Sequence, residues 1–162
     1  VNGARGFGNG LCLPAGPLRE LIKPALKKAQ VLIIVGDDKT KIKSMYKNIN
    51  IDTLTASIKP LYVDKNKKYL AFSGIGNNQS FFDTLIDNNC TVLKTVEFPD
   101  HHFFSENDLN KLKKTASDNN LSLITTEKDF VRIPKEKRNG IECLKVKIKL
   151  HNMDKFMHKL VN

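Results

Sequence analysis

One acid and two imidazoles stand side by side at Asp100, His101 and His102, within the stretch Phe98-Pro99-Asp100-His101-His102-Phe103. A histidine titrates near neutral pH, and a neighbouring carboxylate can fix its tautomer and raise its basicity. A proton-shuttling pair needs these properties. Asp100 and His101 are therefore the first candidates for catalytic residues.

Two other interpretations of this stretch stay open from the residues alone. In the first, His101 caps a backbone group and His102 lies on the surface, since paired groups are often structural. In the second, the stretch binds a metal, because Asp-His-His also begins the motif of some manganese phosphoesterases. Metal sites need several convergent ligands, and the other histidines, His151 and His158, lie in the C-terminal tail. We therefore predict no metal ligand here.

The residues around this stretch predict a loop between a strand and a helix. Residues 91–97 alternate like a half-buried strand, and Pro99 cannot donate to a strand ladder. Ser105, with Asp108 three residues later, is a helix-capping signal before an apolar pattern of helical spacing. In α/β proteins such loops lie at the edge of the sheet where ligands bind. We expect the His101 imidazole to emerge at the carboxyl rim of a parallel sheet.

The rest of the chain repeats strand, loop and helix patterns. Residues 31–35 form a continuous apolar run before Gly36, which predicts a strand buried on both faces. Further expected elements are a surface helix over 39–49 capped by Asp37 or Asp38, buried strands over 69–72 and 121–125, an edge strand over 141–150 and a closing helix over 153–161. Together they predict a three-layer α/β fold with a mostly parallel, Rossmann-like sheet.

Charged residues also follow the expected strand at 121–125. Thr126 precedes Glu127, Lys128 and Asp129, which suits a capped helix start. In a parallel sheet these charges would lie beside the histidine loop. They are equally compatible with exposed charges that favour the helix dipole.

Residues 1–16 hold five of the nine glycines. Glycines permit positive φ and let backbone N–H groups approach a phosphate or substrate, and Arg5 could add charge. The same composition is typical of a plain linker. We expect a helix to begin at Pro17 and to end or kink near Pro24. We also expect the His101 ring to face this segment.

Two glycine motifs fall short of nucleotide-binding signatures. Gly36 precedes Lys39 and Thr40 after a strand, but a P-loop needs a Gly-Lys pair, and none occurs in the chain. Gly74 and Gly76 open an expected helix, but Gln79 stands where the dinucleotide motif has its third glycine. Tight packing between strand and helix is the expected role of this second pair.

Length and composition narrow the possible classes. With 162 residues, 40% of them hydrophobic, the chain is expected to form one globular domain. Its net charge of +10 implies affinity for polyanions, yet only four of 27 basic residues are arginine, which argues against sequence-specific DNA recognition. No apolar run approaches the roughly 20 residues that span a bilayer. The three cysteines form no Cys-x-x-Cys pair, which favours reduced structural thiols.

Four segments are informative in combination. They stand in order across nearly the whole chain: residues 2–10 with 13–20, residues 71–77, residues 98–103 and residues 125–129. In this order and spacing they resemble the C-terminal half of the tetraacyldisaccharide 4'-kinase (lipid A 4'-kinase) family. Each motif alone is weak, but the four in sequence are specific.

The resemblance implies transfer of the ATP γ-phosphate to the 4'-hydroxyl of an acylated disaccharide 1-phosphate, with Mg²⁺, at the cytoplasmic face of the bacterial inner membrane. It implies that His101 assists an aspartate base from the preceding half of the protein, with Asp100 as its neighbour. The remaining site residues that it implies are Arg19 and Glu20 on the nucleotide side and Arg5 and Asn9 on the substrate.

The family's P-loop and its aspartates for metal belong to sequence before residue 1. Val1-Asn2-Gly3 reads as the end of a strand, and no methionine precedes Met45, so we expect a preceding segment. Residues 1–30 would then be left from an N-terminal kinase domain, and 31–162 would form a C-terminal α/β domain. Alone, the chain is expected to be catalytically silent.

The partners implied are the lipid A precursor, the missing kinase half and an anionic membrane surface, with no specific nucleic acid. The alternative is a basic α/β binding module for nucleic acid or anionic lipid.

Overall fold

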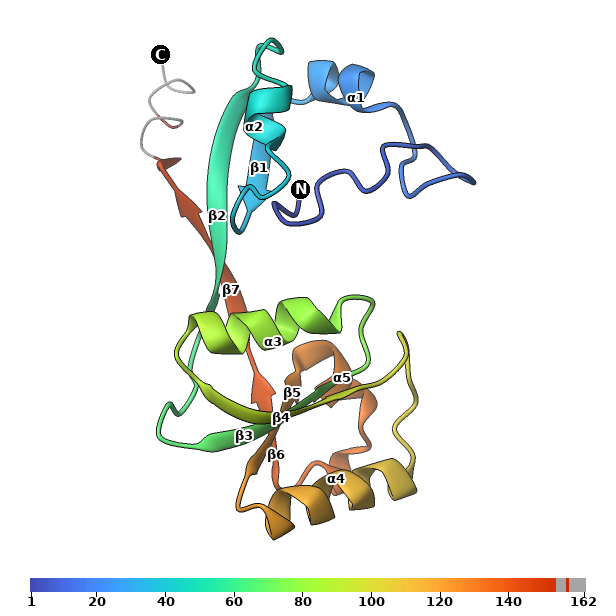
Figure 1. The fold of residues 1–162 in the computed structure, drawn as a ribbon, viewed down its shortest axis with the longest axis vertical. Helices are drawn as coiled ribbons and strands as arrows, with labels where there is room; N and C mark the ends of the chain where they lie inside the picture. Colours follow the sequence, from blue (N-terminus) through green and yellow to red (C-terminus); the bar gives the residue numbers. More distant parts are fainter. Residues whose placement is uncertain (154–156, 158–162) are drawn as a thin grey trace. The chain divides into compact units, whose positions relative to one another are not determined.

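The computed structural model describes residues 1–153 and residue 157. The chain divides into two compact units, and each is described by itself (Figure 1). Unit 1 comprises Val1–Ile58 and Ile148–Asn162, and unit 2 comprises Lys59–Lys147. The expectation of one domain is therefore wrong. Composition gave no sign of the division, because the chain crosses between the units within strands and not in the polar linkers that usually mark such boundaries.

Unit 2 contains a four-stranded parallel sheet with strand order β4-β3-β5-β6. Its elements in chain order are β3 (Lys68–Ser73), α3 (Asn78–Asp87), β4 (Thr91–Glu97), α4 (Glu106–Asp118), β5 (Ser122–Thr126), α5 (Glu127–Arg132), a short 3-10 helix (Lys135–Lys137) and β6 (Ile141–Leu144). The expected strands over 69–72, 91–97 and 121–125 are confirmed to within one or two residues. So are the serine and threonine caps, because Ser105 and Thr126 each accept a bond from a backbone N–H of the following helix.

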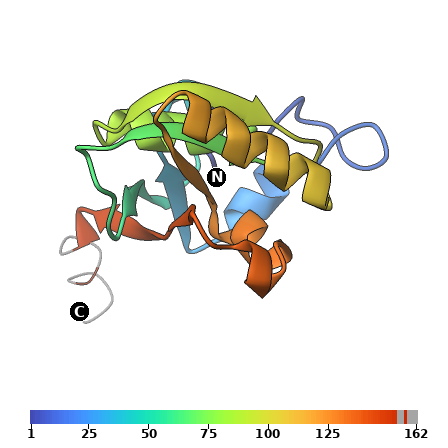
Figure 2. The same cartoon turned by 90° about the horizontal axis from the view of Figure 1, so that it is seen from below.

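Strand β3 shows how this sheet makes three layers. Its side chains alternate between the two faces, as in any strand. Leu70 and Phe72 pack with buried residues of α4, whereas Tyr69 and Ala71 pack with buried residues of α3. Figures 1 and 2 show the two helices on opposite faces of the sheet. The prediction of a three-layer, mostly parallel α/β fold is confirmed. In the sheet, β4 lies on one side of β3 and β5 on the other, so the strand order switches sides between β3 and β5 while all strands stay parallel.

Unit 1 contains a three-stranded sheet of order β1-β2-β7. Its elements are α1 (Ile22–Lys28), β1 (Val31–Val35), α2 (Ile42–Met45), β2 (Asp52–Pro60) and β7 (Val146–His151), of which β2 and β7 continue into unit 2. Strands β1 and β2 are parallel. Asn2 forms a parallel bridge with Val35, so the first residues extend this sheet beside β1.

Two local expectations in unit 1 are wrong. No helix begins at Pro17, because the backbone of Leu18 is already bonded to Leu11 O at 3.2 Å and to Leu13 N at 2.8 Å. Helix α1 starts at Ile22 and includes Pro24, whose missing N–H costs nothing in a first turn. Strand β1 is not buried on both faces, since burial alternates along it.

The expected helix over 39–49 is also shorter than predicted. Lys41 adopts a left-handed conformation with φ of 56°, so α2 begins only at Ile42. The capping role of Asp38 is confirmed: its carboxylate accepts bonds from Ile42 N at 2.8 Å and Lys43 N at 3.0 Å.

The C-terminal part corrects one further expectation. The single edge strand over 141–150 is two strands in two sheets, β6 and β7, which separate at Lys145. The backbone carbonyl of Lys145 accepts a bond from Leu61 N at 2.8 Å instead of continuing the ladder of β6. The expected helix over 153–161 falls mostly outside the described residues.

Candidate functional site

The loops that follow β3, β4 and β5 meet at one edge of the unit 2 sheet, because parallel strands carry their carboxyl ends to the same side (Figure 1). His101 lies in the loop after β4, and its side chain is 81% exposed. The prediction that this imidazole emerges at the carboxyl rim of a parallel sheet is confirmed. Its expected orientation toward residues 1–16 involves the other unit and stays a prediction.

Backbone and amide hydrogen bonds hold the β4 loop against the loop after β3. Phe98 N donates to Ser73 O at 2.8 Å, and the side-chain amide of Asn78 donates to Phe98 O at 3.1 Å. The Asn78 carbonyl oxygen in turn accepts from the Ser73 hydroxyl at 2.7 Å. Asn78 thereby fastens both loops to the start of α3. The β4 loop, which carries His101, therefore starts from a fixed position on the sheet.

The two glycines after β3 give the β4 loop room to approach. A Cβ on Gly74 would lie 3.1 Å from both Pro99 O and the His102 Cβ. A Cβ on Gly76 would lie 3.0 Å from a carboxylate oxygen of Asp100. The Gly-x-Gly pair therefore permits close packing, but its close neighbours belong to the β4 loop, and not to a strand and helix as expected.

His102 has a structural position. Its ring stacks on Phe98 with centroids 4.6 Å apart, and its Nε2 lies 3.1 Å from an Asp108 carboxylate oxygen. Asp108 also accepts from the Ser105 backbone N–H and completes the capping box of α4. The hydrogen bonds from Ser105 and His102 hold the pKa of Asp108 below its ordinary value of 3.8. His102 thus joins the loop to α4 and does not lie free on the surface.

A buried acid and an arginine of α5 complete the rim, and the arginine was missed from the sequence. Asp129 is fully buried and accepts from Gly74 N at 3.0 Å and from the Thr126 hydroxyl at 2.8 Å. Arg132 pairs with Asp129 at 3.2 Å and donates to Gly74 O, also at 3.2 Å. The predicted proximity of the charges after β5 to the histidine loop is therefore confirmed for Asp129.

Arg132 also reaches the histidine itself. Its Nη2 lies 3.1 Å from His101 Nδ1. The Asp100 carboxylate is 3.8 Å from His101 Nε2, beyond hydrogen-bond length, and instead accepts the His101 backbone N–H at 3.0 Å. A sequence signal for Arg132 existed in retrospect: it stands three residues after Asp129 on a short capped helix, where side chains share a face.

The other predicted site residues lie in unit 1. Arg5 and Asn9 line a pocket of about 310 Å³, with residues of the glycine-rich segment and Tyr46. Asn9 is engaged within its own loop, where its amide donates to Ala15 O at 2.9 Å and accepts from Leu11 N at 3.1 Å. Arg5 is exposed at this pocket. The substrate contacts expected of both residues stay predictions.

The predicted nucleotide residues follow directly in the chain. Arg19 is exposed, and the Glu20 carboxylate forms an exposed ion pair of 2.9 Å with Lys28. A nucleotide could approach Arg19 as it stands, but contact with Glu20 would compete with Lys28. These roles also stay predictions.

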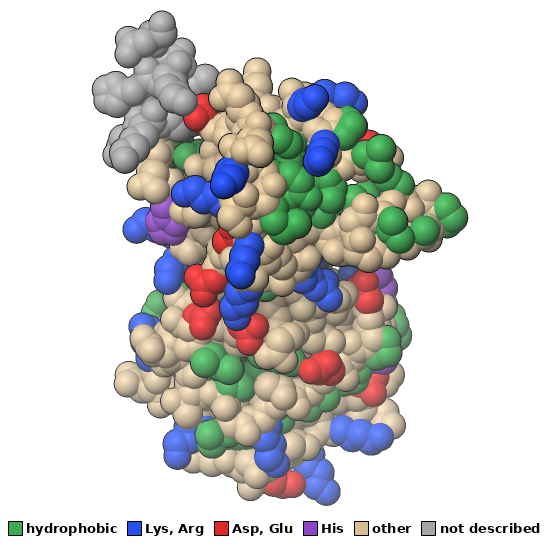
Figure 3. Space-filling view, turned by 45° about the horizontal axis from the view of Figure 1, so that its top comes forward, with side chains coloured by type: hydrophobic (Ala, Val, Ile, Leu, Met, Phe, Trp, Pro, Cys, Tyr) green, Lys and Arg blue, Asp and Glu red, His purple; other side chains and the backbone are tan. Residues whose placement is uncertain are grey.

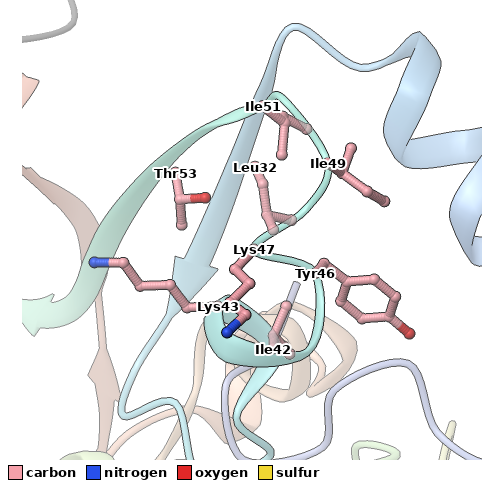
Figure 4. Close-up of a pocket in the computed structure, with 8 residues that line it drawn as sticks. All are labelled: Leu32, Ile42, Lys43, Tyr46, Lys47, Ile49, Ile51 and Thr53. Atoms are coloured by element: carbon pink, nitrogen blue, oxygen red, sulfur yellow. The ribbon is translucent and has the colours of Figure 1, made fainter.

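A second pocket in unit 1 has a volume of about 310 Å³ (Figure 4). Its lining combines apolar side chains with two lysines and two hydroxyl-bearing residues: Leu32, Ile42, Lys43, Tyr46, Lys47, Ile49, Ile51 and Thr53. None of the predicted site residues lies on it, although it shares Ile42 and Tyr46 with the pocket at Arg5 and Asn9.

The described residues show neither a cluster of metal ligands nor a helix suited to a membrane. No three His, Cys, Asp or Glu side chains among them gather closely enough to hold a metal ion. Their helices are also too short or too polar to cross a bilayer. Figure 3 shows lysine and arginine side chains interspersed with acidic and hydrophobic ones on the drawn face of each unit.

Comparison with known proteins gives a consistent result along the whole chain. Residues 1–162 match the family model described as Tetraacyldisaccharide-1-P 4'-kinase. The chain is 37% identical over 161 residues to the tetraacyldisaccharide 4'-kinase of Rickettsia akari, and 39% over 163 residues to that of Rickettsia bellii. Each alignment covers 99% of this chain and 49% or 50% of the relative. The chain therefore spans about half the length of the curated relatives it matches.

One solved structure shares the fold. The LpxK protein of Aquifex aeolicus, crystallised in complex with ATP, is 22% identical and aligns with a TM-score of 0.60. The alignment covers 93% of this chain and 47% of that one. At this identity the likeness supports the fold alone.

Proposed function

Because the chain belongs to the tetraacyldisaccharide-1-P 4'-kinase family, we propose that it supplies the histidine loop of an ATP-dependent lipid-sugar kinase. The reaction transfers the γ-phosphate of ATP to the 4'-hydroxyl of a tetraacyl-disaccharide 1-phosphate in lipid A biosynthesis. The observation that carries the proposal is the exposed His101 imidazole, held by one ring nitrogen at the carboxyl rim of the sheet.

The rim suits the demands of phosphoryl transfer, in which positioning and charge stabilisation do most of the work. His101 acts beside a carboxylate base that comes from the other half of the protein. Asp100 holds the backbone of His101 through the bond to its N–H. Hydrogen bonds within the loops and from Arg132 position the imidazole, which is what an assisting group needs.

The nucleotide and metal are held mainly by the other half. The described residues offer no carboxylate cluster for Mg²⁺, so we assign the metal no ligand among them. Arg19 is placed on the nucleotide side, where its exposed guanidinium can pair with phosphate. Glu20 contacts the nucleotide beside Arg19 once its ion pair with Lys28 opens. Arg5 and Asn9 contact the acylated disaccharide at the edge of the pocket that they line.

The substrate is an anionic lipid, so we place the protein at the cytoplasmic face of the inner membrane as a peripheral protein. The net charge of +10 favours an anionic membrane surface. The rival function, nucleic-acid binding, rests on the same charge. A salt titration against DNA and against vesicles with and without the acylated disaccharide separates the two. Preference for vesicles that carry the disaccharide supports the kinase, and equal binding to DNA and vesicles supports the rival.

The activity test uses the chain alone and together with a polypeptide that supplies the preceding half of a relative. We expect no ATP-dependent phosphorylation of the disaccharide from the chain alone and clear phosphorylation from the pair. Kinase activity of the isolated chain would show that the division of roles is wrong. Absence of phosphorylation by a stable, correctly folded pair would contradict the kinase proposal.

A further inference from the structure

We propose that Arg132 is a positioning residue that fixes His101 as the Nε2–H tautomer. The catalytic consequence of this assignment rests on the proposed kinase function, whereas the tautomer itself does not. In this proposal Arg132 acts through His101, because its guanidinium contacts the ring.

The tautomer follows from the chemistry of the two partners. An arginine side chain is always protonated in proteins and can only donate hydrogen bonds. At 3.1 Å from Arg132 Nη2, the Nδ1 atom of His101 must therefore be the acceptor. In the neutral ring the hydrogen then lies on Nε2. The ring offers one donor, Nε2–H, to whatever approaches it.

Two anchors fix the guanidinium in this position. Its Nη1 donates to Asp129 Oδ1 and to Gly74 O, both at 3.2 Å. Asp129 is itself fully buried and held by Gly74 N and the Thr126 hydroxyl. Because the charged partner of Arg132 cannot turn away into solvent, the arginine is restrained although it is 27% exposed. A free surface arginine would not orient a ring in this way.

The loop backbone is tied to the same point. The Gly74 carbonyl accepts from the His101 backbone N–H at 3.1 Å as well as from Arg132. His101 has a φ of 62°, a conformation that is uncommon for a residue with a side chain and that this bond supports. The Gly74 carbonyl thus positions both the backbone of His101 and the Arg132 guanidinium that contacts its ring.

Asp100 does not perform this task in the structure. Its carboxylate lies 3.8 Å from Nε2, too far for a hydrogen bond. The neighbouring acid therefore supports the backbone, whereas the distant arginine orients the ring. In the proposed kinase, His101 then donates its Nε2–H to the carboxylate that acts as base and holds that carboxylate in place.

The direct test is the nitrogen NMR spectrum of the ring in the 162-residue chain with ¹⁵N-labelled histidine, at a pH where the ring is neutral. Signals of His101 are assigned with a His101→Gln variant. We expect the Nε2–H pattern in the wild type and a mixture of tautomers in Arg132→Met. Lys135→Met, which removes an exposed charge three positions after Arg132 in the chain, should keep the wild-type pattern.

An Nδ1–H pattern in the wild type would overturn the proposal, and so would an unchanged pattern in a folded Arg132→Met. The wild-type spectrum decides the tautomer even if that variant fails to fold. The reconstituted kinase gives the second readout. Arg132→Met should lower kcat on the order of 10-fold with little change in KM, since misplacement of a catalytic group slows the chemical step.

The loss of kcat caused by Arg132→Met should vanish in a His101→Ala background, because the effects of residues that act as a unit are not additive. An equal loss in that background would show that Arg132 acts by another route. A kinase that is inactive despite the Nε2–H pattern would refute the proposed function and leave the positioning role standing.

Discussion

The backbone N–H of Gly74 donates to the buried carboxylate of Asp129 at 3.0 Å, although 55 positions separate the two residues. The bond joins the end of β3 to α5 where the strand order of the sheet reverses. In open α/β sheets, ligands bind in the crevice at such a point. Because Gly74 also binds the His101 backbone, the Asp129 carboxylate stabilises the edge of the sheet that carries His101.

Removal of this acid should destabilise the protein strongly. In Asp129→Ala the bonds to Gly74, Thr126 and Arg132 are lost together, and each buried donor left without a partner typically costs about 1–3 kcal/mol. Asp129→Asn keeps the shape and should lose less, about 1–3 kcal/mol. Urea unfolding followed by circular dichroism measures both. Asp118→Ala, at an exposed position, is the matched control, and equal stability of the two alanine variants would contradict this account.

The two glycines after β3 should differ in their tolerance of a methyl group. At Gly74 the new Cβ would meet the backbone oxygen of Pro99, which cannot move alone, so we expect a loss of about 1–3 kcal/mol. At Gly76 it would meet the end of the Asp100 side chain, which can rotate away. Thermal unfolding of Gly74→Ala and Gly76→Ala compares them. A larger loss for Gly76→Ala would show that the loop contacts are not as described.

The cap of α4 should give the protein a defined acid sensitivity. The pKa of Asp108 is lowered in the folded state, first by the Ser105 hydroxyl and then by His102. A lowered pKa stabilises the fold above the unfolded value, and the benefit fades as pH falls toward the folded value. The stability advantage of the wild type over Asp108→Asn should thus be full near pH 7 and shrink below about pH 5. An advantage that grows on acidification would contradict the assignment.

Local patterns predicted much of the rim. Pro99, Ser105 and Thr126 each lie next to the strand end or helix start that they mark. These signals could therefore be read directly from the sequence. The contact of Arg132 with His101 could not, because it joins residues 31 positions apart through packing of α5 against the loop. The sequence therefore paired His101 with its neighbour Asp100, whereas the structure shows its ring bonded to Arg132.

Unit 1 was less predictable for similar reasons. The left-handed Lys41 and the closed loop at Leu18 depend on hydrogen bonds that sequence periodicity does not reveal. The division into two units was hidden because β2 and β7 continue across it. The domain boundary expected at residue 30 does not coincide with this division, and the origin of residues 1–30 in a preceding kinase domain stays a prediction.

The most direct test of the central claim is phosphate transfer by the chain paired with the preceding half of a relative. Labelled ATP and tetraacyl-disaccharide 1-phosphate are the substrates, and wild type is compared with His101→Ala. We expect the wild type to form the 4'-phosphorylated product and His101→Ala to lose kcat on the order of 100-fold, as for other proton-transfer groups. Undiminished product from a folded His101→Ala would show that the imidazole at the rim takes no part in the reaction.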